Sequence, residues 1–264
     1  MTDVLIKDLR DGLLILKMNR PESRNALNPE LTQALCEATA SAAEDPAVRA
    51  VLLTGSAGHF CVGGDVKAMN AGKGREISLG ERIHALRERM TASQYLHEMA
   101  KPTIALIEGS CAGAGLSLAL ACDLRICAES AKITTAFAKV GLSGDFGGTC
   151  FLTRMLGAAR ARELYLLSPV LSGRDAAELG LVTRTVADDA VWAEAMAVAQ
   201  SLAVGPTLTL GRIKRNIALA EGGGSLGDCF DQEARNHILS STTNDHKEAA
   251  AAFVAKRKPV FIGT

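Results

Sequence analysis

Residues 103–128 read TIALIEGSCAGAGLSLALACDLRICA, and this one stretch contains two strand-like segments with a helix-like segment between them. The apolar runs Thr103–Ile107 and Leu124–Ala128 have the length and composition of buried strands. Small residues fill the turn Gly109–Gly115, and a helical run then continues to Ala121. A strand, a helix and a second strand in this order predict an α/β architecture.

The chain before this stretch extends the same pattern. Two β-like runs, Val4–Leu9 and Leu13–Met18, flank Asp11-Gly12, a pair that is typical of a hairpin turn. An Asn-Pro pair predicts the beginning of a helix over residues 29–44, because asparagine caps helices and proline is tolerated in the first turn. A further buried strand is expected over Ala50–Thr54.

Glycines and mixed charges predict a loop over residues 70–80, and residues 81–99 have the pattern of one helix. The last third of the chain is helical in period throughout. Its expected helices cover residues 191–202, 207–220, 226–239 and 247–255. We therefore predict two parts, an α/β core of residues 1–190 and a helical region of residues 191–264.

Composition excludes several classes of function. The 264-residue chain has 29 basic and 29 acidic residues, so its formal net charge of zero offers no long-range attraction to nucleic acids or anionic membranes. Aromatic residues make up 4% of the chain, too few for base-stacking platforms. No apolar run approaches 18 residues, and residues 1–8 do not resemble a signal peptide. The seven cysteines lack a C-x-x-C spacing, which favours free thiols in a reducing cytoplasm.

Motifs for cofactors and metals are weak or missing. Gly113 and Gly115 begin like a dinucleotide-binding fingerprint, but Leu118 stands where the third glycine is required. The five histidines show no ligand spacing such as H-x-x-x-H. We therefore predict neither a nicotinamide cofactor nor a metal site.

Two turns, Phe60–Lys67 and Gly109–Leu116, share one physical character. Each leaves extended chain, passes through small residues and opens a helix. Small residues allow a ligand to approach the backbone closely, and the first N–H groups of a helix have no intrahelical partner. Two such N–H groups could converge on one developing oxyanion. The alternative is that both segments are only tight turns between packed elements.

Five segments, taken in order, resemble the signature segments of the crotonase (enoyl-CoA hydratase/isomerase) superfamily. They are Asn19–Leu27, Phe60–Asp65, Ala112–Gly115, Cys122–Ile126 and Ala252–Arg257. The resemblance implies a spiral of ββα units with a C-terminal helical trimerisation region. It also implies an acyl-CoA thioester as substrate and a homotrimer or hexamer, with coenzyme A entering as part of the substrate and no separate cofactor.

The resemblance also assigns site residues. It implies that the backbone N–H groups of Gly64 and Ala114 bind the thioester oxygen. Contacts to coenzyme A are implied for residues of the early loop, the first turn and the C-terminal helix, which could come from a neighbouring subunit. These contact residues are Ser23, Arg24, Val62, Asp65, Val66, Lys67, Phe253 and Lys256.

The hydratases of this superfamily use two glutamates, and this sequence has neither of them. Ser117 and Phe137 occupy their positions, and neither side chain is a useful base near pH 7. A similarly placed aspartate is the base in some isomerase members, which implies that Asp145 is catalytic. Ser117, Phe137 and Phe146 are then expected to line the acyl pocket. From the residues alone, Asp145 could also serve only the end of the helix that follows it.

The closest resemblance is to the ring-1,2-epoxyphenylacetyl-CoA isomerases and the Δ3,Δ2-enoyl-CoA isomerases, which points to phenylacetate catabolism. We expect an acyl-CoA isomerase that shifts a double bond or rearranges an epoxide to an oxepin. Two alternatives stay open, an enoyl-CoA hydratase with a non-standard acid/base set and a catalytically silent acyl-CoA-binding homologue. A dehalogenase-like activity is disfavoured, because such enzymes carry a tryptophan at the position of Phe137.

Overall fold

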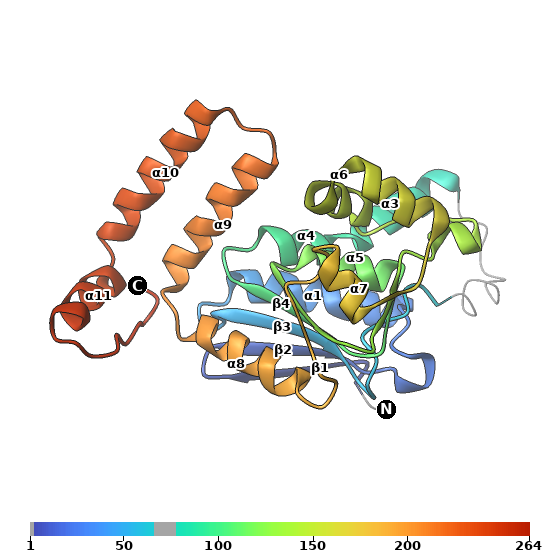
Figure 1. Cartoon of the computed structure of the whole chain (residues 1–264), viewed down its shortest axis with the longest axis horizontal. Coiled ribbons are helices and arrows are strands. Elements are labelled where there is room, and N and C mark those ends of the chain that lie inside the picture. The colour runs from blue at the N-terminus through green and yellow to red at the C-terminus, as the bar shows by residue number, and fades with distance from the viewer. Residues whose placement is uncertain (1–2, 66–77) are drawn as a thin grey trace.

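The computed structural model describes residues 3–65 and 78–264. Within these residues, two β-sheets form the centre of the body (Figure 1). The larger sheet has the strand order β1-β2-β3-β4-β6-β9 and the smaller one the order β5-β7-β8. The strands are β1 (Leu5–Arg10), β2 (Leu13–Met18), β3 (Ala50–Gly55), β4 (Thr103–Ile107), β5 (Ser110–Ala112), β6 (Leu124–Ala128), β7 (Lys132–Thr134), β8 (Leu171–Ser172) and β9 (Arg184–Val186).

The helices of the described chain divide between the body and the C-terminal third. Those up to residue 203 are η1 (Pro21–Ser23), α1 (Pro29–Glu44), α3 (Leu79–Arg89), α4 (Thr91–Glu98), α5 (Ala114–Ala121), η2 (Phe137–Val140), α6 (Gly148–Leu167), α7 (Gly173–Glu178) and α8 (Val191–Ala203). The remaining helices are α9 (Thr207–Glu221), α10 (Leu226–Ser241) and α11 (Asn244–Val254).

Local sequence signals explain the first elements. β1 and β2 pair antiparallel around Asp11 and Gly12, whose positive φ angles of 49° and 81° match the turn that an Asp-Gly pair favours. The side chain of Asn28 accepts a hydrogen bond from the N–H of Leu31 at 2.8 Å, and Pro29 is the first residue of α1. The predictions for the hairpin and for α1 are confirmed.

The parallel part of the larger sheet carries the helix that matters most for the site. Strands β2, β3, β4, β6 and β9 pair in parallel, and the predicted strands over residues 50–54, 103–107 and 124–128 are confirmed. Every residue of α5 is buried, because the helix lies inside the body against α4 and α6. Full burial of each leucine in it contributes about 2 kcal/mol. The interior therefore fixes the position of Ala114 at the beginning of α5.

Two predictions about local structure need correction. The single helix expected over residues 81–99 is two helices, α3 and α4, separated at Met90. The hydroxyl of Thr91 donates to the carbonyl of Glu88 at 2.7 Å, and such side-chain bonds compete with the helical pattern. The sequence also gave no warning of β5, β7 and β8, which are too short to show an alternating pattern. Most of the loop predicted over residues 70–80 lies outside the described residues.

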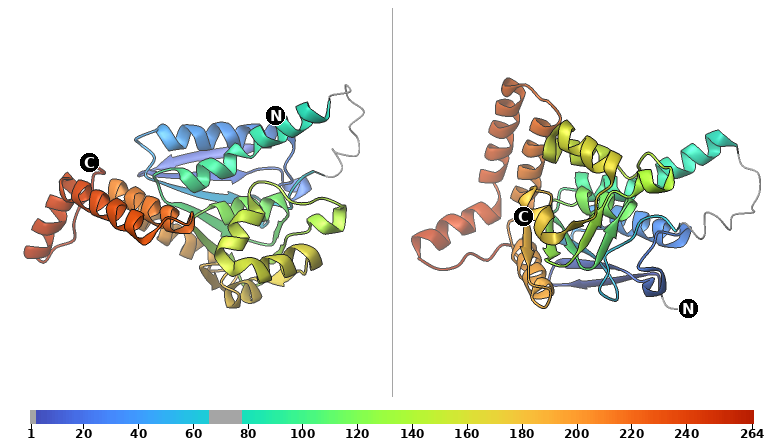
Figure 2. Two further views of the ribbon diagram at one scale, coloured as in Figure 1. Left: turned by 90° about the horizontal axis from the view of Figure 1, so that it is seen from above. Right: turned by 45° about the vertical axis from the view of Figure 1, so that its right-hand side comes forward.

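The last helices stand apart from the sheets. α8 packs on β3, β4 and β6 with Val191, Ala195, Ala199 and Ala203 buried at a spacing of four, so the predicted boundary between residues 190 and 191 precedes a helix of the body. Figures 1 and 2 show α9, α10 and α11 projecting to one side, away from α3. Among the described helices, none combines the length and apolar character needed to cross a bilayer.

Candidate active site at two backbone turns

The two small-residue turns predicted to form the site lie against each other. Gly63 has a φ of +87°, and a Cβ there would lie 2.9 Å from the carbonyl oxygen of Ala112 and 3.2 Å from the nitrogen of Ala114. Only glycine fits this combination of left-handed backbone and close contact. The N–H of Ala112 donates to the carbonyl of Cys61 at 2.9 Å, which ties the second turn to the first.

Each turn presents one backbone donor. The chain on both sides of Gly64 is held by Leu27, whose N–H donates to Gly63 at 2.7 Å and whose carbonyl accepts from Asp65 at 3.1 Å. Ala114 is the first residue of α5, where helical N–H groups have no intrahelical partner. Within the described part of the chain, no acceptor pairs with the N–H of either Gly64 or Ala114. Two unpaired donors on touching turns are the arrangement that binds an oxyanion.

The early loop fixes the first turn. Asn25 is fully buried at a φ of 59°, and its side-chain amide donates to the carbonyls of Ser56 and His59 at 3.1 and 2.8 Å. Arg20 forms an ion pair with Asp65 at 3.1 Å. Because these bonds join the loop to both ends of the first turn, they hold Gly64 in place. Asp65 was predicted to contact coenzyme A. In the structure its carboxylate pairs with Arg20 of the early loop.

Two further predicted contact residues lie beside the first turn. The N–H of Val62 donates to the carbonyl of Arg24 at 3.3 Å, and the hydroxyl of Ser23 donates to Arg20 at 3.1 Å. The side chain of Arg24 is exposed. Val66 and Lys67, which were also predicted to contact coenzyme A, lie outside the described residues.

Asp145 precedes α6 but does not cap it. The N-cap residue of α6 is Gly147, no side chain caps the helix, and Asp145 takes part only through its backbone carbonyl, which accepts from Gly148 at 3.1 Å. Its Oδ1 atom is buried and has no hydrogen-bond partner among the described residues. Burial raises the pKa of this carboxyl from 3.8 to about 6. The helix-end interpretation is therefore not supported, and the carboxyl is free to accept a proton.

Asp145 interacts electrostatically with Cys61 of the first turn and with Tyr165 of α6. Burial, with a smaller contribution from the charge of Asp145, raises the pKa of the Cys61 thiol to about 12. Burial likewise raises the pKa of Tyr165 to about 12, and Asp145 adds to that rise. Since Cys61 belongs to the first turn, the carboxyl of Asp145 lies within electrostatic range of that turn.

Buried side chains close the space around these groups. Phe137 and Phe146 are buried, and the Phe137 ring would lie 3.8 Å from a Cβ on Gly113. The rings of Phe137 and Tyr165 stack with centroids 6.0 Å apart and an interplanar angle of 1°. Ser117, at 1% exposure, faces Gly148. Of the predicted acyl-pocket residues, Phe137 therefore lies near the second turn and Ser117 lies on the helix that this turn opens.

Sequence reasoning did not find Tyr165. It lies 20 residues after Asp145, near the end of α6, in a segment without a motif. The available signal was indirect, because the glycines at positions 144 and 148 leave space for a large neighbour. A Cβ on Gly144 would lie 3.1 Å from the Tyr165 ring.

The structure does not bring Phe253 and Lys256 to this site within one chain. Phe253 is 85% exposed, and α11 lies on the side of the molecule away from α3 and α6 (Figure 1). Lys256 follows α11 with a φ of +53°. Any contribution of these two residues to a site would therefore have to come from another copy of the chain.

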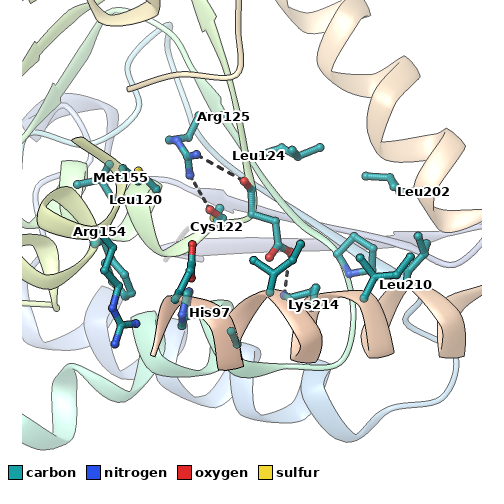
Figure 3. Close-up of a pocket in the computed structure, with 17 residues that line it drawn as sticks. His97, Leu120, Cys122, Leu124, Arg125, Arg154, Met155, Leu202, Leu210 and Lys214 are labelled. Carbon is teal, nitrogen blue, oxygen red and sulfur yellow. Dashed lines mark hydrogen bonds and ion pairs between the residues drawn. The ribbon is translucent and has the colours of Figure 1, made fainter. Parts of the chain in front are cut away.

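A separate pocket of about 370 Å³ lies between α9 and the body (Figure 3). At this pocket, Lys214 on α9 forms an ion pair with Asp123 of the body at 2.8 Å. The same carboxylate accepts from the N–H and the hydroxyl of Thr103 at 2.7 and 3.0 Å. The residues that line this pocket include none of the predicted site residues, so it belongs to the attachment of α9.

The arrangement at the turns has a defined chemical capacity. Paired backbone donors stabilise negative charge on a carbonyl oxygen, and a carboxyl with a pKa near 6 can take and return a proton at neutral pH. In the described residues no group of three or more histidine, cysteine, aspartate or glutamate side chains could hold a metal ion.

Comparisons with known proteins cover the whole chain. The sequence profile of the enoyl-CoA hydratase/isomerase family matches residues 8–264. The 1,2-epoxyphenylacetyl-CoA isomerase of Escherichia coli (strain K12) is 36% identical over 264 residues, which is 100% of each protein. The crotonyl-CoA hydratase of Syntrophomonas wolfei is 31% identical and covers 98% of this chain and 97% of its own. An enoyl-CoA hydratase crystal structure from Polaromonas sp. JS666 superposes with a TM-score of 0.90 at 32% identity, over 98% of this chain and 99% of its own. The predicted fold class is confirmed.

Proposed function

We propose that this chain, which belongs to the enoyl-CoA hydratase/isomerase family, is an acyl-CoA isomerase that shifts a double bond or rearranges an epoxide to an oxepin. The thioester oxygen would accept hydrogen bonds from the N–H groups of Gly64 and Ala114. These bonds strengthen as the carbonyl gains enolate character, and removing one such donor typically lowers a rate by about 10²–10³-fold. Asp145 would remove a proton from the acyl group and return one at another carbon.

The observation that carries the proposal is the buried Oδ1 of Asp145, which has no hydrogen-bond partner among the described residues and whose carboxyl acts electrostatically on Cys61 of the first turn. A carboxylate without a hydrogen-bond partner is a stronger base, and a pKa of about 6 suits proton transfer at neutral pH. Ser117 and Phe137 occupy the positions where hydratases carry their two glutamates, which favours isomerisation over the addition of water. The identity to an epoxyphenylacetyl-CoA isomerase supports the same choice.

For coenzyme A we propose contacts from the early loop and the first turn. Ser23, Arg24, Val62 and Asp65 lie together there. Val66 and Lys67 follow the same turn in sequence.

We also propose a homotrimer or hexamer in which a neighbour supplies Phe253 and Lys256. Large apolar residues that are exposed on the projecting helices support this assembly, namely Leu208, Ile213, Ile217, Leu226, Phe230, Ile238, Leu239, Phe253 and Val254. A cytoplasmic location and a place in phenylacetate catabolism complete the proposal; seven free thiols and the similarity to the E. coli isomerase support them.

The experiment is a substrate panel with product identification. Purified protein is incubated with a Δ3-enoyl-CoA, a Δ2-enoyl-CoA and an epoxyphenylacetyl-CoA, in parallel with Asp145→Asn. We expect double-bond isomers or an oxepin from the wild type and neither from the variant. A 3-hydroxyacyl-CoA as the main product would indicate a hydratase instead. Tight binding without any turnover would indicate a silent homologue.

A further inference from the structure

The hydroxyl groups of Ser117 and Tyr165 approach the same residue, Gly148. Ser117 belongs to α5 and Tyr165 to α6, and the two helices approach at Gly148. A Cβ on Gly148 would lie 2.3 Å from the Ser117 Oγ and 2.6 Å from the Tyr165 hydroxyl oxygen. The absent side chain of Gly148 therefore makes room for a pair of hydroxyls.

This pair stands next to the proposed base without binding it. The ring of Tyr165 packs against Gly144, whose Cβ would lie 3.1 Å from the ring and 3.7 Å from the hydroxyl oxygen. The charge of Asp145 acts on the Tyr165 hydroxyl, yet the Oδ1 of Asp145 has no partner among the described residues. The phenol therefore packs against the residue that precedes Asp145 and lies within electrostatic range of its carboxyl.

In the described part of the chain, the phenol of Tyr165 has no hydrogen-bond contact other than the one with Ser117. Burial raises the pKa of Tyr165 to about 12, so the phenol keeps its proton at neutral pH. The hydroxyl of Ser117 faces the phenol and can donate to its oxygen. The other acceptor near Ser117, the carbonyl of Gly113, is 3.4 Å away, which is long for an O–H donor. A phenol that accepts one hydrogen bond becomes a better donor of its own proton.

The ring that carries this donor packs against an aromatic side chain. Phe137 stacks on the Tyr165 ring. Phe146, the residue after Asp145, is also buried. A purely hydrocarbon acyl group in this space would leave the phenol O–H without an acceptor, which costs about 1–3 kcal/mol for a buried group. An acyl group with an oxygen atom at this point would satisfy it.

We propose that Tyr165, oriented by Ser117, donates a hydrogen bond to an oxygen atom of the acyl group and so selects oxygenated acyl-CoA substrates. The inference rests on the proposed function and deepens it, because it names the substrate class of the same site. In an epoxide-to-oxepin rearrangement, the carbon–carbon bond shared by the two rings breaks while both carbon–oxygen bonds stay. The phenol therefore transfers no proton. It stabilises the ring oxygen, and Asp145 alone moves a proton between carbons.

Binding measurements test the proposal whether or not the protein turns over. The dissociation constants of phenylacetyl-CoA and 2-hydroxyphenylacetyl-CoA are measured by calorimetry for the wild type, Tyr165→Phe and Ser117→Ala. Tyr95→Phe is the matched control, because Tyr95 is the one other tyrosine and lies on α4. We expect the wild type and Tyr95→Phe to bind the hydroxylated ligand about tenfold more tightly. In Tyr165→Phe the ratio of the two dissociation constants should be close to one. In Ser117→Ala this ratio should be smaller than in the wild type.

Kinetics give the second readout. Tyr165→Phe keeps the ring that stacks on Phe137, so the fold is retained. We expect its kcat/KM for epoxyphenylacetyl-CoA to fall about 10- to 100-fold, while kcat/KM for a Δ3-enoyl-CoA changes less than about threefold.

Equal losses on both substrates, or equal affinity of the wild type for both ligands, would overturn the role of Tyr165. Neither outcome would touch Asp145. The proposed function fails separately, if the wild type isomerises neither substrate or if Asp145→Asn keeps its activity.

Discussion

Replacing Asp145 by asparagine should stabilise the folded protein while it abolishes isomerisation. Burial raises the pKa of this carboxyl from 3.8 to about 6, which means that the charged form is penalised in the folded state. For a fully buried carboxyl, this rise in pKa would correspond to a loss of about 3 kcal/mol in the free energy of unfolding at neutral pH. Because the carboxyl is partly exposed, solvent screening reduces the expected effect to about 1–2 kcal/mol.

The contribution of Asp145 to the free energy of unfolding depends on pH. Between pH 3.8 and about 6 the folded protein binds more protons at Asp145 than the unfolded chain does, so the free energy of unfolding falls as pH rises. The amide of Asp145→Asn does not titrate, and its own packing cost is the same at every pH. The stability difference between variant and wild type should therefore widen by about 1 kcal/mol between pH 4.5 and pH 6.5 in favour of the variant, then stay level.

Urea unfolding at pH 4.5, 5.5, 6.5 and 8 measures this difference. Asp175→Asn is the control without a pH trend in this range, because the Ser172 hydroxyl lowers the pKa of Asp175 below its ordinary value of 3.8 and the carboxyl is ionised in both the folded and the unfolded state. The stability difference between that variant and the wild type should therefore stay nearly constant from pH 4.5 to pH 8. A difference for Asp145→Asn that is independent of pH, or that favours the wild type more at pH 8 than at pH 4.5, would refute the claim that Asp145 is a destabilised, buried base.

Three further predictions concern the turns, the C-terminal attachment and the thiols. Gly63→Ala should lower kcat by about 10²-fold or more with the fold retained, as circular dichroism can check, because the new Cβ displaces one oxyanion donor; unchanged kcat would contradict this. Asp123→Ala should lower the free energy of unfolding by about 3 kcal/mol in urea titrations, since three donors, Lys214 among them, lose their acceptor; a loss below about 1 kcal/mol would contradict it. Cys150 is exposed and should react with a thiol reagent in the folded protein. Four thiols are buried and should react only after unfolding, which counting of modified sites by mass spectrometry would show: Cys61, Cys111, Cys122 and Cys127.

The sequence was most informative where one local signal determines the structure. Asp11-Gly12 specifies a hairpin turn, Asn28-Pro29 begins a helix, and apolar runs such as Thr103–Ile107 form the parallel strands. Each depends on backbone propensity or on burial of a contiguous segment. The same kind of signal predicted the two turns of the site, because glycine at position 63 is required by the close approach of the second turn.

Features that depend on contacts between distant segments could not be predicted. Tyr165 enters the site only because α6 folds back over α5. The break at Met90 depends on side-chain hydrogen bonds that the helical periodicity does not show. The position of Phe253, far from the turns, follows from the direction in which α9–α11 leave the body. The resemblance of the motif predicts that Phe253 contacts coenzyme A, but it does not say in which subunit the coenzyme A is bound.

The proposed isomerisation requires Asp145 to transfer a proton to or from an acyl group that is bound through its thioester oxygen. Deuterium uptake from D₂O into the acyl chain of a Δ3-enoyl-CoA, followed by mass spectrometry across pH 4.5–8, measures that step. We predict an exchange rate that rises with pH up to about 6 and is then constant, and a rate about 10²–10⁴-fold lower in Asp145→Asn. Wild-type exchange that does not change across this pH range, or full exchange in Asp145→Asn, would contradict it.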